Sequence, residues 1–153
     1  MMQLGVNVPN FGPGTDPGVL REWAEADDTT APVPIWIGGH SQAAIRRAVR
    51  FGDAWHPLRL PLARMRSALT SHSLPSFAPR IALRLTTALV DDPERPAGVG
   101  TIEQILDDLD QLRLLGADTV VLDPYHGDPE ETRRPRAAWQ ALTAVATHGR
   151  TPS

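Results

Sequence analysis

The chain of 153 residues contains no cysteine and no lysine, since all 15 of its basic residues are arginine. Without cysteine the chain can form no disulfide, no thiolate metal site and no cysteine nucleophile. Without lysine it can form no Schiff base through a side chain. The bias toward arginine, together with 15 prolines and 12 glycines, is typical of a protein from a GC-rich genome.

Long apolar runs are also absent. No stretch approaches the roughly 20 residues of a membrane helix, and the N-terminus lacks the basic and then apolar order of a secretory signal. We therefore expect a cytoplasmic protein with no membrane partner. The net charge is −3 and no basic block stands out, which argues against a nucleic-acid partner. Apolar and charged contents of 41% and 22% are those of a globular chain, and the length suits one domain.

One segment combines a short apolar strand, two glycines and an amphipathic helix. The strand ends at Ile37, Gly38 and Gly39 form the turn, and the helix follows Ser41. This order places unpaired backbone N–H groups and the positive end of a helix dipole at one point, where an anionic group can bind. Because glycine lacks Cβ, a phosphate could approach the backbone closely. The alternative is a tight turn without a ligand, in which Ser41 is a helix cap rather than a catalytic hydroxyl.

Strands and helices alternate five times along the chain with short connections. Such alternation predicts the α/β class with a parallel sheet. Five units are too few for a closed eight-stranded barrel, so the residues leave open a small doubly wound sheet or a piece of a barrel. The expected strands cover residues 3–9, 34–37, 53–57, 80–90 and 119–123, the expected helices about 17–26, 42–51, 61–69, 101–115 and 136–147, and the expected loops 71–79 and 91–100.

The helix expected over 101–115 begins with capping-box spacing and has a stripe of leucine and isoleucine that predicts its buried face. The remaining acidic side chains are expected to form its solvated face. They are Glu103, Asp107, Asp108 and Asp110.

Several polar and aromatic side chains fall near the carboxyl ends of the expected strands. His56 ends a strand beside Trp55 and is either a site residue or a polar residue at a strand end. Asn7 either points toward a cofactor or hydrogen-bonds across the core. Trp36 and Trp55 are either core aromatics, the simpler interpretation, or stacking partners, and His126 is expected in a solvated loop. The histidines show no i, i+4 pair, so no metal site is expected.

Four segments, taken together and in order, resemble the bacterial luciferase-like monooxygenase family, especially its coenzyme F420-dependent members. Residues 4–12, 32–41, 52–57 and 116–122 are similar to that family's first, fifth, sixth and eighth strands. The family fold is a TIM-like barrel about twice as long as this chain. The resemblance implies a partial TIM (β/α)8-type barrel of about five βα units with parallel strands, in which units two to four are lost at a cut near 26–31.

The resemblance also implies the domain organisation and the cofactor. A single luciferase-like domain would span 1–150, with the first βα unit at 1–26, a seam at 27–32 and the C-terminal units at 33–150. The expected cofactor is F420, with FMN as the alternative, and its phosphate would lie at the glycine turn. The implied cofactor-binding residues are Gly38, Gly39, His40, Ser41, Asn7, Trp55 and His56.

The function implied by the resemblance is that of an oxidoreductase or monooxygenase. Hydride would pass between F420 or FMN and a small organic substrate, an activity that the loss of barrel strands can impair. No catalytic residue is assigned, because the family's missing strands usually carry the histidine near the substrate. The alternative is a non-catalytic cofactor-binding or interaction module. A partial barrel leaves two unpaired strand edges, so we expect a homo-oligomer that forms through those edges.

Overall fold

The computed structural model of this protein describes residues 34–124 and 135–148. The chain divides into two units, Met1–Pro34 and Ile35–Ser153, and almost all of the described residues belong to the second unit. The strand expected at 3–9, the helix expected at 17–26 and the seam at 27–32 therefore lie outside the described residues.

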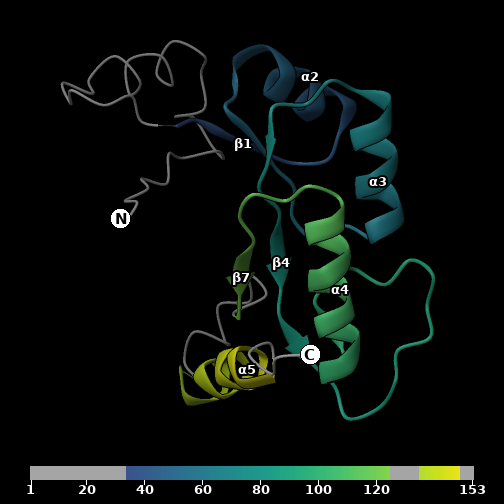
Figure 1. Cartoon of the computed structure of the whole chain (residues 1–153), viewed down its shortest axis with the longest axis vertical. Coiled ribbons are helices and arrows are strands. Elements are labelled where there is room, and N and C mark those ends of the chain that lie inside the picture. The colour runs from purple at the N-terminus through teal and green to yellow at the C-terminus, as the bar shows by residue number, and fades with distance from the viewer. Residues whose placement is uncertain (1–33, 125–134, 149–153) are drawn as a thin grey trace, which may run out of the picture. The chain divides into compact units, whose positions relative to one another are not determined.

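The described part of the chain contains four helices and seven short strands (Figure 1), and four of the strands, β3 to β6, follow one another without a helix between them. None of these helices is both long enough and apolar enough to span a membrane. The helices are α2 (Gln42–Phe51), α3 (Leu62–Ser71), α4 (Ile102–Leu114) and α5 (Pro135–His148), and the strands are β1 (Trp36–Gly38), β2 (Ala54–His56), β3 (Ser76–Phe77), β4 (Arg80–Ala82), β5 (Arg84–Leu85), β6 (Val99–Gly100) and β7 (Val121–Asp123).

The described strands form three small sheets in which every pairing is parallel. One sheet has the order β1-β2-β3, a second pairs β4 with β7, which lie side by side in Figure 1, and a third pairs β5 with β6. The α/β class and the parallel pairing agree with the sequence prediction. The predicted partial TIM-type barrel is wrong, because the described strands are only two or three residues long and make separate sheets of two or three strands.

Proline and a change of strand partner account for the short strands. Pro79 separates β3 from β4, and proline has no N–H to donate to a ladder. The strand predicted over 80–90 breaks after β4. The Leu83 N–H donates to the Asp123 carbonyl at 2.8 Å, whereas the Arg84 N–H donates to the Gly98 carbonyl at 2.8 Å. The chain thus passes from one sheet to another within two residues, which hydrophobic alternation alone does not reveal.

The predicted helix starts are confirmed in detail. Ser41 is the N-cap of α2, and its Oγ accepts a hydrogen bond from the Ala44 N–H. Thr101 and Gln104 form the capping box of α4. The loops predicted at 71–79 and 91–100 are partly wrong, because the first contains β3 and the second contains β6. Both strands have two residues, too few to produce a periodic pattern.

The core lies where the helices pack onto one side of the strands. Trp55 and Phe77 from neighbouring strands pack with Met65 of α3 and Leu112 of α4, and all four side chains are buried. A smaller cluster joins α4 to α5 around Leu83, Ile105 and Val145. The side chains of Trp55 and Phe77 lie on the core face of this sheet. Because successive side chains of a strand point to opposite faces, the neighbouring His56 lies on the other face.

The acidic run of α4 does not form one solvated face as predicted. The Asp108 side chain is fully buried, whereas Glu103, Asp107 and Asp110 are exposed. Asp108 is buried because Arg95, from the preceding loop, pairs with it. Helical spacing could have placed Asp108 among the buried leucines, but its partner Arg95, which is partly buried, comes from outside the helix.

Candidate functional site

The turn between β1 and α2 has the geometry of an anion site. Gly39 adopts a φ of 97°, a conformation that favours glycine. The Ser41 Oγ accepts from the Ala44 N–H at 3.2 Å. Gln42 and Ala43 are in the first turn of α2, so their N–H groups have no helical carbonyl four residues earlier to bond. These two N–H groups also have no other acceptor among the described residues. Two backbone donors at the positive end of α2 are therefore available to an anionic group.

A buried tryptophan holds this turn in place. The Trp55 indole Nε1 donates to the Gly39 carbonyl at 2.9 Å, and its ring stacks on Phe77 with ring centroids 5.6 Å apart. The side chain is completely buried. Trp55 is therefore a core aromatic and not an accessible stacking partner. Its hydrogen bond to the Gly39 carbonyl positions the turn from the core side.

His56 lies next to the turn and presents a neutral imidazole. The register of β1 and β2 pairs Gly38 with His56. The His56 Nδ1 lies 2.5 Å from the Ala78 carbonyl oxygen, so Nδ1 carries the proton and Nε2 keeps its lone pair. Burial lowers the pKa of His56, the bond to Ala78 opposes that shift, and the nearby positive charge of Arg80 lowers the pKa further.

Trp36 contacts His56 on the sheet face opposite the core. The ring centroids of Trp36 and His56 are 5.4 Å apart, with the planes inclined by 42°. The Trp36 side chain is 37% exposed, and its register partner is Ala54, two residues before His56. An accessible indole beside a neutral imidazole offers an apolar surface and a hydrogen-bond acceptor to a planar ligand.

The structure adds an ion pair that sequence reasoning did not assign to the site. Arg80 Nη2 donates to Asp123 Oδ2 at 2.8 Å, and Asp123 is nearly buried. The Arg80 Nε is buried and has no hydrogen-bond partner within residues 34–124 and 135–148. The sequence offered only a weak signal for this pair: Arg80 begins one expected apolar strand and Asp123 ends another. The register that brings them together, with Arg80 opposite Val121 and Ala82 opposite Asp123, appears only in the structure.

The expected cofactor-binding residues divide into three groups. Gly38, Gly39, Ser41 and His56 lie together at the carboxyl ends of β1 and β2 and at the start of α2, where ligands bind in parallel sheets. His40 is exposed beside them and Trp55 lies beneath them in the core. Asn7 lies outside the described residues, so its prediction stays open. The same holds for His126, which was expected in a solvated loop and not in the cofactor site.

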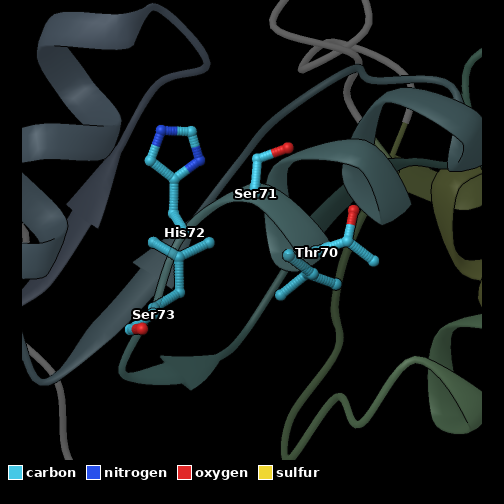
Figure 2. Close-up of a pocket in the computed structure, with 6 residues that line it drawn as sticks. Thr70, Ser71, His72 and Ser73 are labelled. Atoms are coloured by element: carbon cyan, nitrogen blue, oxygen red, sulfur yellow. The ribbon is translucent and has the colours of Figure 1, made fainter.

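A separate polar hollow lies where α3 ends (Figure 2). Its volume is about 430 Å³ and residues 69–74 line it, among them Thr70, Ser71, His72 and Ser73. The His72 Nδ1 is 3.2 Å from the Ala68 carbonyl oxygen, and the Thr70 hydroxyl donates to carbonyls one turn earlier. None of the predicted site residues lines this hollow, so we do not assign the candidate site to it.

The described residues contain no cluster of three or more histidine, aspartate or glutamate side chains that could hold a metal ion. The candidate site of this part of the chain is thus a pair of backbone N–H groups at the start of α2, flanked by an imidazole and an indole. No protein-family model matches the chain, and no curated protein matches it either.

Proposed function

We propose that the turn between β1 and α2 binds the phosphate of F420 or FMN, and that the chain is an oxidoreductase domain related to the luciferase-like monooxygenases. The observation that carries the proposal is the pair of N–H groups of Gln42 and Ala43, which have no acceptor among the described residues, at a turn where Gly39 has a positive φ. The helix dipole adds only about 0.3–1 kcal/mol per charge at an exposed end, so these donors supply much of the phosphate affinity.

The side chains around the turn suit the remainder of such a cofactor. Trp36 offers an accessible ring, and the His56 Nε2 can accept a hydrogen bond from the cofactor or the substrate. A bound deazaflavin or flavin supplies the hydride chemistry, while the protein binds and orients it. F420 is preferred to FMN because the four segments at 4–12, 32–41, 52–57 and 116–122 most resemble F420-dependent members of the family.

Titration with FMN, F420 and riboflavin, followed by tryptophan fluorescence, tests the phosphate site. We expect saturable binding of the two phosphorylated cofactors and weak binding of riboflavin, which has no phosphate. Gln42→Glu should weaken FMN and F420 binding by about tenfold, because it places a carboxylate beside the bound phosphate. The same change should preserve or raise the stability of α2, since an acidic side chain suits a helix N-terminus.

Gln42→Arg is the matched control, because it replaces the same exposed side chain with a positive charge. It should bind FMN at least as tightly as the wild-type chain. The phosphate site is refuted if neither cofactor binds, or if riboflavin binds as well as FMN and Gln42→Glu has no effect. If binding occurs but stopped-flow mixing shows no hydride transfer from reduced F420 or FMN to any of a panel of small organic acceptors, the oxidoreductase assignment is wrong and only cofactor binding stands.

One observation favours the alternative of a non-catalytic interaction module. β1 is an edge strand among the described residues; it presents the half-exposed Trp36, and the half-exposed Ile35 directly precedes it. An edge with exposed apolar side chains can pair with another chain. Trp36→Lys should abolish an association of this kind, and it should weaken FMN binding only if Trp36 also contacts the cofactor.

A further inference from the structure

The outer face of α2 carries positive charge that no described carboxylate neutralises. Arg46, Arg47 and Arg50 are exposed, and α2 itself has no acidic residue. None of the ion pairs of the described residues includes these arginines. At 100° per residue the three side chains share one face of α2, opposite the buried Ala44 and Ile45.

Apolar side chains accompany these arginines. Val49 is 47% exposed and Phe51 is 60% exposed, and the Arg50 guanidinium lies 4.8 Å from the centre of the Phe51 ring. These residues border a surface hollow of about 470 Å³, lined by Ala43, Arg46, Arg47, Val49, Arg50, Phe51 and His72. A surface of this composition fits a partner that carries both carboxylates and an apolar side chain.

The matching composition occurs on α4 of the same chain. Glu103, Asp107, Asp110 and Leu114 are all exposed, and their spacing of i, i+4, i+7 and i+11 puts them on one face. That face is opposite the buried Ile105, and Leu114 is 74% exposed. Asp110 contacts Arg113 only through an exposed pair at 3.7 Å, which an external partner can replace.

We propose that two copies of this chain associate through α2 of one copy and α4 of the other. In a parallel arrangement Arg46 meets Asp107, Arg50 meets Asp110, and Phe51 covers Leu114. With a rise of 1.5 Å per residue the arginines are about 6 Å apart along α2 and the aspartates about 4.5 Å apart along α4, a difference that arginine side chains can span. This association goes beyond the proposed cofactor site and uses helix faces rather than strand edges.

Charge exchange between the two helices tests the proposal. Sedimentation of the wild-type chain at about 0.2 mM should show association in roughly 20 mM salt that weakens in about 0.5 M salt, because salt screens exposed charges. Arg46→Glu/Arg50→Glu and Asp107→Arg/Asp110→Arg should each weaken self-association at least about tenfold. An equimolar mixture of the two variants should associate again, since each α2 then meets an α4 of opposite charge.

Control variants separate this contact from other causes of association. Arg66→Glu/Arg84→Glu makes the same change in net charge at two exposed positions outside α2 and should leave association unchanged. Circular dichroism should show that every variant is folded. The proposal is overturned if the wild-type chain is a monomer in low salt, if the mixture does not associate, or if Trp36→Lys rather than the α2 variant dissociates the protein. A wild-type monomer that binds an acidic peptide would assign the α2 face to a different partner.

Discussion

Arg95 and Asp108 form a bidentate ion pair that joins the loop before α4 to the helix. Arg95 Nη1 lies 2.7 Å from Asp108 Oδ2, and Nη2 lies 2.8 Å from Oδ1. The Gly98 N–H also donates to Oδ2, and Arg95 Nη1 reaches the Val99 carbonyl. The hydrogen bond to Asp108 raises the pKa of Arg95 above its already high value. This pair fixes the loop before α4 and thereby positions β6.

Removal of one partner of this pair should destabilise the protein strongly. Arg95→Ala should lower the free energy of unfolding by about 3–5 kcal/mol, because it leaves the fully buried Asp108 carboxylate without its partner. Asp108→Ala should cost less, because the Arg95 side chain is only partly buried. Urea denaturation measures both effects. Arg95→Met/Asp108→Leu should lose much less than the sum of the single changes. Additive losses would show that the two residues do not act as a pair.

The lowered pKa of His56 predicts a loss of stability in acid. The unfolded chain, with a pKa near 6.5 for this histidine, binds a proton more readily than the folded chain does. The contribution of His56 is therefore complete above pH 6.5, and it decreases as the pH falls from 6.5 to the lower folded pKa. In His56→Gln this part of the pH dependence should disappear, so the difference in unfolding free energy between wild type and variant should rise with pH.

An NMR titration of the His56 ring checks the same point directly. The wild-type pKa should lie below 6.5, and Arg80→Met should raise it without restoring the ordinary value, because burial is the larger cause. A His56 pKa at or above 6.5 in the wild-type chain would contradict both the protonation state and the acceptor role assigned to Nε2.

The two glycines of the turn should respond differently to substitution by alanine. Gly39 has a φ of 97°, and a Cβ there would lie 3.0 Å from the Ala44 Cβ. Gly39→Ala should therefore cost about 1–2 kcal/mol of unfolding free energy. Gly38 is the matched control, because its Cβ would meet the His56 carbonyl oxygen at 3.7 Å, an ordinary contact. Thermal denaturation should show Gly38→Ala close to wild type, and equal losses at both positions would contradict this geometry.

Gln104 connects the first turn of α4 to the loop before it. Its Oε1 accepts from the N–H groups of Val90 and Thr101 at 3.0 and 3.2 Å, and its Nε2 donates to the Val90 carbonyl at 3.0 Å. Gln104→Ala should cost about 2 kcal/mol, because it removes one side of the capping box and the tether to Val90. The Val90 amide should then exchange its hydrogen faster.

Gln104→Glu separates the two contributions of this side chain. The carboxylate keeps the acceptor for Thr101 but cannot donate to the Val90 carbonyl. Its effect on unfolding free energy should therefore lie between those of the wild-type chain and Gln104→Ala. Unchanged exchange of the Val90 amide in Gln104→Ala would show that the tether contributes nothing.

The amino-acid sequence by itself determined the helices and helix caps of the described chain. Ser41 and Thr101 were recognisable as helix caps, and the helices that follow them form where the apolar spacing predicts. Caps and amphipathic stripes act within a few residues, so they can be recognised without any knowledge of tertiary contacts. The glycine turn before α2 was predictable for the same reason.

The tertiary structure alone decided the sheet pairing and the environment of the charged side chains. Hydrophobic alternation could not show that Leu83 and Arg84 pair with different strands, and this change of partner is one cause of the failed barrel prediction. Nor could it show that Arg80 meets Asp123 or that Asp108 is buried against Arg95. Such contacts join residues far apart in the sequence or from different elements, and their energies depend on burial and register, which exist only after the chain has folded.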